Sequence, residues 1–198
     1  MVPLIARIAD RSFSALQSFG QRKNKRVTQI LPCFDERFDD LWSRLSSQHP
    51  TLTVRDRRFL KWRYRDCPLR QYKTLGLLTE DGSRLLGYLI YYVEDHAAVC
   101  ADVLASDGAE DLDSLLMSWA ALARGDGLAS LSVSCPDGGL AATLEQQGFT
   151  CRSILPASRP DRTRRHEPCK TLFAHERHPG TNLSDTDDWY YTEGDTLY

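Results

Sequence analysis

The sequence lacks any long uninterrupted run of apolar residues. No stretch of its 198 residues approaches the roughly 20 apolar residues that a membrane-spanning helix needs. The first residues also lack the continuous apolar core of a secretion signal. Together these absences predict a cytoplasmic protein without a membrane span.

Neither an excess of one charge nor a metal-binding pattern is present. The net charge is -2, which disfavours nucleic acid as a partner. The six cysteines are widely spread and form no CxxC pair, so we expect reduced structural thiols. None of the five histidines approaches a cysteine at the spacing of metal ligands, so we expect no metal site.

What the chain does have is the composition of an ordinary folded domain. It is 41% apolar and 26% charged, and its length suits one domain with appendages. We expect an N-terminal helix and basic linker at residues 1–26, a folded domain at 27–174 and an acidic tail at 175–198.

The N-terminal segment has the spacing of an amphipathic helix. Its apolar residues recur every three to four positions between residues 4 and 19, and the basic stretch 20–26 (GQRKNKR) follows. Such a helix could dock on its own domain, on a second domain or chain, or on an anionic membrane surface.

Strand and helix signals alternate along the folded domain. A short strand is expected at 27–31, after which Asp35 can cap a helix whose apolar residues fall at i, i+3, i+4 and i+7. The further expected elements are a helix at 54–65, antiparallel strands at 72–78, 85–93 and 97–105, a long helix capped by Ser106 or Asp107, a strand at 128–134, a shorter helix from 137, a strand at 149–155 and a last strand at 169–174.

This order predicts an α/β (α+β) fold in which helices flank a mixed, mostly antiparallel sheet. It resembles the GNAT acyl-CoA N-acyltransferases over residues 27–173. Residues 144–149 (LEQQGF) resemble the family's helix, Gly-Phe, strand ending, and residues 101–105 (ADVLA) stand where its fourth strand would lie. The resemblance implies transfer of an acyl group, acetyl being favoured, from acyl-CoA to an amine of a small molecule or sugar.

The resemblance also implies where a coenzyme would bind. In the family the fourth and fifth strands splay apart, and the pantetheine arm of acetyl-CoA or another acyl-CoA fills the gap. The positions that match these coenzyme contacts are Val103, Leu104, Ala105, Ser106 and Gly108.

The family's glycine-rich pyrophosphate loop is degenerate in this chain. Residues 106–113 read SDGAEDLD, with one glycine, no preceding arginine or glutamine, and four carboxylates. At about 1 kcal/mol or more for each close like-charge contact near a surface, these carboxylates would oppose a pyrophosphate. Their alternative role is to stabilise the helix N-terminus through its dipole. A non-catalytic GNAT-like binding or assembly module is therefore the alternative function.

Acyl transfer to an amine needs a base and an acid. Glu94, at a strand end, and Asp102, inside an apolar strand, are the candidate bases, and a satisfied structural carboxylate is the alternative for Asp102. The family's usual tyrosine acid is missing from residues 148–156, where Cys151 is the nearest group with a proton to give.

The second helix and the loop after it would roof the acceptor pocket of a GNAT fold. The resemblance therefore makes substrate contacts of Trp62, Arg63, Tyr64 and Tyr72. The alternative is that the tryptophan packs the helix on the sheet while the arginines are solvated or pair with nearby aspartates.

The chain is also similar to the C-terminal halves of longer two-domain GNAT-like proteins of bacteria. The similarity lies in residues 62–64 (WRY), in the strand start at Gly87-Tyr88 and in the acidic end that contains Trp189. On this resemblance, residues 1–26 would connect to a second GNAT-like domain or to the partner in a homodimer. Relatives that use aminoacyl-tRNA are a weaker alternative, because the chain lacks a basic face.

Overall fold

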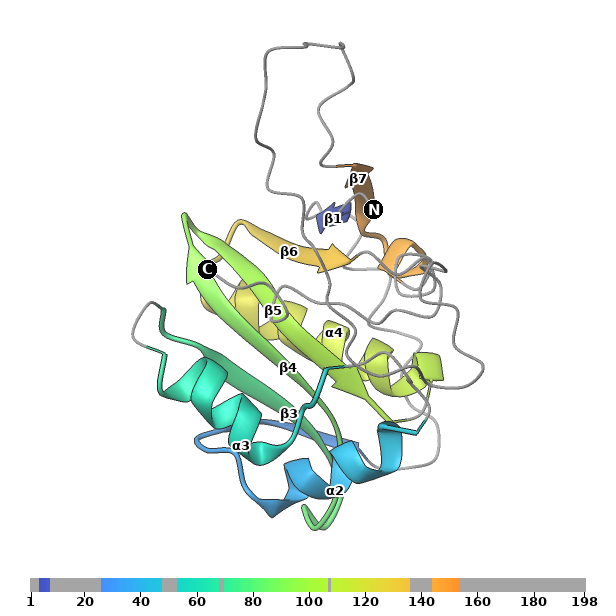
Figure 1. The fold of residues 1–198 in the computed structure, drawn as a ribbon. Helices are drawn as coiled ribbons and strands as arrows, with labels where there is room; N and C mark the ends of the chain where they lie inside the picture. Colours follow the sequence, from blue (N-terminus) through green and yellow to red (C-terminus); the bar gives the residue numbers. More distant parts are fainter. Residues whose placement is uncertain are drawn as a thin grey trace, which may run out of the picture.

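The computed structural model describes residues 4–7, 26–47, 53–67, 70–106, 108–135 and 144–153. Within these ranges one sheet has the strand order β2-β3-β4-β5-β6-β1-β7 (Figure 1). Its strands are β1 (Leu4–Arg7), β2 (Arg26–Leu31), β3 (Lys73–Thr79), β4 (Leu85–Glu94), β5 (Ala97–Ala105), β6 (Ser130–Cys135) and β7 (Thr150–Ser153). Only the β5–β6 pair is parallel among the described strands. The predicted mixed, mostly antiparallel sheet is confirmed.

Helices flank the sheet on both faces (Figure 1). They are α2 (Glu36–Leu45), α3 (Arg57–Leu60) with the π-helical turn η2 (Lys61–Arg65), and α4 (Gly108–Gly125). None of the helices in the described residues is both long and apolar enough to cross a membrane.

Local signals explain α2. The side chain of Asp35 accepts a hydrogen bond from the backbone N–H of Arg37 at 3.1 Å and so caps the helix. In the predicted apolar stripe Phe38, Leu41 and Leu45 are buried, and the fourth member, Trp42, is half-buried. Both the cap and the stripe match the sequence-based prediction.

The second helix is shorter than predicted and changes its winding. Asp56 caps α3 through a 2.7 Å hydrogen bond from the backbone N–H of Phe59. The chain then widens into η2, which closes when the N–H of Asp66 donates to the carbonyl of Lys61 at 2.9 Å. In this winding Tyr64 is buried while Trp62 is 59% exposed.

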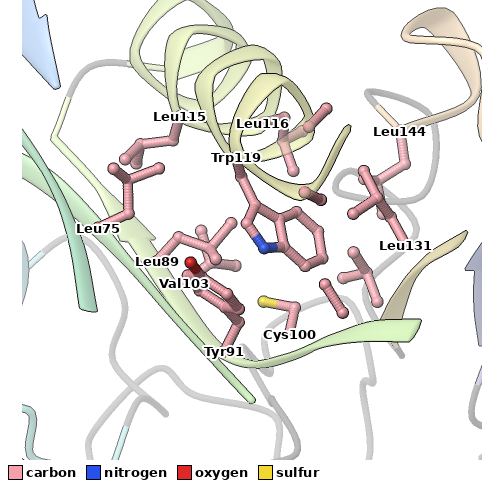
Figure 2. Close-up of a cluster of buried hydrophobic side chains, with 14 of the residues drawn as sticks. Leu75, Leu89, Tyr91, Cys100, Val103, Leu115, Leu116, Trp119, Leu131 and Leu144 are labelled. Carbon is pink, nitrogen blue, oxygen red and sulfur yellow. The ribbon is translucent and has the colours of Figure 1, made fainter. Parts of the chain in front are cut away.

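The sheet separates two cores. Under α4, Trp119 is fully buried among side chains of β3, β4 and β5 that include Leu75, Leu89 and Val103 (Figure 2). On the other face, side chains of α2 and α3 pack against alternate residues of the same strands, such as Tyr88. The strands are therefore buried on both faces, which agrees with their continuous apolar sequences.

The N-terminal segment corrects one prediction. Leu4–Arg7 do not begin a helix; they form β1, which lies between β6 and β7 and is antiparallel to both. Pairing on both sides gives the backbone a full set of hydrogen bonds, and a helical spacing in the sequence cannot reveal such distant partners. Residues 8–25, the helix start at 137, the expected strand at 169–174 and the acidic tail lie outside the described residues.

Truncation of Trp119 tests the core under α4. We expect Trp119→Ala to lower the free energy of unfolding by about 3–5 kcal/mol, because a large buried side chain leaves a cavity. Trp62→Ala is the matched control, and its exposed indole should be worth less than about 0.5 kcal/mol. Urea unfolding of both variants measures the difference, and equal losses would contradict the assignment.

Candidate functional site

The central strand β5 carries a bulge. Tyr91 of β4 pairs with Cys100, but the preceding residue, Ile90, pairs with Asp102. Ala101 is therefore an extra residue on β5, as in a β-bulge. Bulges of this kind bend a strand and re-aim its side chains, so the bulge sets the geometry of everything that follows it in β5.

Beyond the bulge, β5 leaves β6. The parallel pairs run from Ala97 with Ser130 to Cys100 with Val133 and stop there. Figure 1 shows the two strands diverging toward their C-terminal ends. In the part of the chain that the structure describes, the β5–β6 ladder therefore ends at the bulge, and the two strands separate beyond it.

The predicted coenzyme contacts follow one another along β5 beyond the bulge and into the start of α4. They are Val103, Leu104 and Ala105 in β5, Ser106 just after it, and Gly108 at the start of α4. The side chains of Val103 and Leu104 are buried in opposite cores, so only their backbone could meet a ligand. The backbone N–H of Ser106 donates to the carbonyl of Leu86 at 2.7 Å.

The bulge also turns two successive side chains to the same face. Cys100 and Val103 belong to the core under α4, whereas Ala101 belongs to the opposite core. Asp102 lies on that opposite side too, since its carboxylate contacts the phenol of Tyr88. In a regular strand neighbouring side chains alternate, so the bulge is what brings Asp102 to the face covered by α2 and α3.

Asp102 lies in a buried charge cluster. Its carboxylate is within 3.1–3.2 Å of Arg55 Nε and accepts a 3.0 Å hydrogen bond from Tyr88, and both charged side chains are 0% exposed. Arg55 also donates to the carbonyl of Thr53 at 2.9 Å. Burial, and then the charge of Asp102, raise the pKa of Tyr88 well above its ordinary value, so the phenol stays protonated. These contacts favour the structural alternative for Asp102.

Arg55 was missed by the sequence analysis. It stands in the charged segment before α3, where arginines are ordinarily solvated, and nothing in its neighbours signals burial. A carboxylate within an apolar strand is the one available signal, because a buried carboxylate calls for a buried cation.

The second candidate base lies elsewhere. Glu94 ends β4, pairs with Ala97, and is 56% exposed beside Arg70, 3.6 Å away. It stands four residues along β4 from Ile90, the partner of Asp102, which is about 13 Å at the rise of a strand. The two predicted bases therefore do not meet at one reacting centre.

The four predicted acceptor contacts divide into two pairs. Tyr64 and Tyr72 meet edge to face at 5.1 Å and both line an open pocket of about 600 Å³ between the β2–α2 loop, the end of η2 and the segment before β3. Trp62 instead packs against Phe59 on the outer surface of the helix, and neither Trp62 nor Arg63 lines this pocket.

The first turn of α4 is occupied by its own carboxylates. Asp111 is buried and lies 2.7 Å from Arg26 Nε, and it accepts a 3.0 Å hydrogen bond from the hydroxyl of Ser106. Arg26 also bonds Glu110 at 3.2 Å. Burial, and next the charge of Glu110, raise the pKa of Asp113. The position that would bind a pyrophosphate in the family is thus occupied by carboxylate side chains of this chain.

The described residues contain no group of three His, Cys, Asp or Glu side chains that could hold a metal ion. Cys33, Cys67 and Cys100 are free thiols.

Comparison with known proteins supports the fold. No protein-family model and no curated protein matches this sequence. A functionally unknown conserved protein from Staphylococcus epidermidis is similar, with 12% identity and a TM-score of 0.51, over 77% of this chain and 59% of that one. An Enterococcus faecalis protein of unknown function, described as a probable N-acyltransferase, is similar with 10% identity and a TM-score of 0.54, over 77% of this chain and 37% of that one. This chain thus spans less than two thirds of either structure, and at such identity the likeness shows the fold alone.

Substitution in the buried charge cluster should be costly. We expect Arg55→Met and Asp102→Asn each to lower the free energy of unfolding by about 3–5 kcal/mol, because each leaves a buried partner uncompensated. The double variant should lose less than the sum of the two. Asp126→Asn, from the exposed Lys73–Asp126 pair, is the control and should cost at most about 1 kcal/mol. Urea unfolding would contradict the prediction if the two losses were additive.

A methyl group at Gly87 should disturb the end of β5. A Cβ there would lie 2.8 Å from the carbonyl oxygen of Leu104 and 3.0 Å from Cα of Ala105, and backbone cannot move aside cheaply. We expect Gly87→Ala to destabilise the fold by about 1–3 kcal/mol. Gly125→Ala is the control, since nothing lies within 4 Å of its Cβ. Thermal unfolding of the two variants should differ, and a Gly87→Ala protein as stable as the control would refute the close approach.

Proposed function

We propose that this chain is a GNAT-type N-acyltransferase domain, which moves an acyl group, acetyl being favoured, from a pantetheine thioester such as acyl-CoA to an amine of a small molecule or sugar. The observation that supports the proposal is the bulge of β5 followed by the separation of β5 from β6 at residues Ala101–Ala105, which we call the donor edge. Where two strands separate in this way, a pantetheine arm can lie along the first strand and pair with it through its two amides, as an added strand would.

The donor is held mainly by its pantetheine arm. The first turn of α4 contributes the carboxylates of Glu110 and Asp111, and Arg26 is already engaged with both. A pyrophosphate at this turn would meet like charge, so the nucleotide end of CoA adds little to the affinity. This distinguishes the proposed site from a helix N-terminus that binds phosphate through free N–H groups.

The reaction is direct attack of the amine on the thioester carbonyl. A C–N bond forms as the C–S bond breaks, the amine gives up one proton to a base, and the departing thiolate takes one. Of the two predicted bases, Glu94 is the one that is exposed to solvent. Asp102 is a positioning residue, because its buried contacts hold the bulge that shapes the donor edge. Glu94→Gln should therefore lower turnover without loss of stability if Glu94 takes the proton.

A non-catalytic GNAT-like binding or assembly module is the second candidate. Two features favour it. The carboxylates in the first turn of α4 do not help to bind CoA, and the carboxylate of Asp102, which is paired with Arg55, does not serve proton transfer. The two candidates differ in one measurable property, namely affinity for an acyl-pantetheine.

Calorimetry with two donors separates the candidates. We expect acetyl-CoA and S-acetylpantetheine to bind with affinities within about fivefold of each other, because about 1 kcal/mol at most is gained from the nucleotide end. Glu110→Lys should tighten acetyl-CoA by about fivefold and leave S-acetylpantetheine unchanged, since it replaces an exposed anion beside the proposed pyrophosphate position by a cation.

Glu36→Lys, at an equally exposed position on α2, is the matched control and should change neither affinity. Absence of heat with both donors at millimolar concentration would contradict the acyltransferase proposal and leave the binding module.

A further inference from the structure

The pocket of about 600 Å³ is separate from the donor edge. It is bounded by the loop from β2 to α2, the end of η2 and the segment that leads into β3. No residue of β5 or β6 in the described ranges lines it, and β3 and β4 stand between β2 and β5 in the sheet. The pocket and the donor edge therefore share no residue among those that the structure describes.

The charged side chains that line the pocket are all of one sign. They are Arg65 and Arg70, and no carboxylate is among the described lining residues. Of the nearby carboxylates, Asp35 pairs with Arg37 at 2.7 Å and Glu94 approaches Arg70 at 3.6 Å, while the exposed Asp66 stands between two lining residues in the chain. In a chain whose net charge is -2, this is a local concentration of positive charge around a hollow.

Neighbouring groups hold both guanidinium groups in place. That of Arg70 lies 4.1 Å above the ring of Tyr92, which contacts Tyr72 edge to face at 5.7 Å. Arg65 donates a hydrogen bond to the carbonyl of Pro32, which also lines the pocket. Side chains that are already ordered lose less freedom when a ligand binds, so these contacts favour binding.

The uncharged residues that line the pocket indicate which groups a ligand has besides its charge. Leu31, Phe34, Tyr64 and Tyr72 give the pocket apolar and aromatic surface next to the two cations. Guanidinium groups match the planar, two-oxygen geometry of carboxylates and the oxygens of phosphates. We propose that this pocket binds a small organic oxyanion, in which a carboxylate or a phosphate monoester is attached to a ring or short apolar group.

Titration with four probes tests the ligand class. Benzoate and phenyl phosphate represent the two oxyanions, benzyl alcohol is the neutral probe and inorganic phosphate lacks the ring. We expect saturable binding of at least one ring-bearing anion below about 10 mM, with benzyl alcohol and inorganic phosphate at least about tenfold weaker. Which of the two binds more tightly identifies the oxyanion. The absence of saturable binding by both, or equal binding of the neutral probe, would overturn the proposal.

Matched arginine variants locate the charge. Arg65→Met and Arg70→Met should each raise the half-saturating anion concentration by about tenfold or more. Arg58→Met is the control, because Arg58 is an exposed arginine of α3 that does not line the pocket. Circular dichroism confirms that each variant is folded. An equal effect of Arg58→Met would indicate attraction by overall charge and would refute a built site.

Two thiols give a readout of position that requires no variant. Cys33 and Cys67 line the pocket, whereas Cys100 is buried in the core under α4. A saturating anion should slow alkylation of Cys33 and Cys67 by iodoacetamide, as followed by peptide mass spectrometry. Unchanged alkylation during saturation would place the ligand elsewhere and overturn the assignment to this pocket. Failure of acetyl-CoA to bind would leave this result unaffected.

Discussion

The buried pair of Arg55 and Asp102 is the interaction on which the rest of the structure depends. Two opposite charges with no exposed surface are tolerated only as partners, so the segment before α3 must sit over the bulge of β5. That contact places the start of α3, and with it the turn η2 whose Tyr64 lines the pocket. It also places Asp102 on the side of Tyr88, which keeps the bulge in register. The bulge of β5 and one wall of the pocket are thus connected through this one buried pair.

The two candidate sites have opposite local charge although the whole chain is nearly neutral. The end of β5 and the first turn of α4 bring together Glu110, Asp111 and Asp113, offset by Arg26. The pocket on the β2–β3 side carries Arg65 and Arg70. A ligand with an oxyanion is therefore attracted to one region and opposed at the other, a distinction that net charge conceals. This separation is consistent with a donor held through uncharged amides and a second ligand recognised through its charge.

Features with local causes were predictable from the sequence. The cap at Asp35 and the apolar stripe of Phe38, Leu41 and Leu45 are sufficient to predict α2. Strand β5 has the predicted bounds because its apolar run lies between turn residues. Predictions that depended on distant partners fared differently. Leu4–Arg7 form a strand because β6 and β7 flank them, and the stretch predicted as one helix divides into α3 and η2. Arg55 could not be recognised among the other arginines of its segment.

The sequence by itself determined the order of the described elements after residue 26, the apolar central strand β5 and the acidic first turn of α4, because each of these is encoded in a short stretch of neighbouring residues. Only the tertiary structure decided that β5 bulges at Ala101, that Asp102 is neutralised by Arg55, and that Tyr64, Tyr72, Arg65 and Arg70 surround one pocket. These features arise between segments far apart in the chain, and the energy of a buried charge or a shared pocket exists only once those segments are packed together.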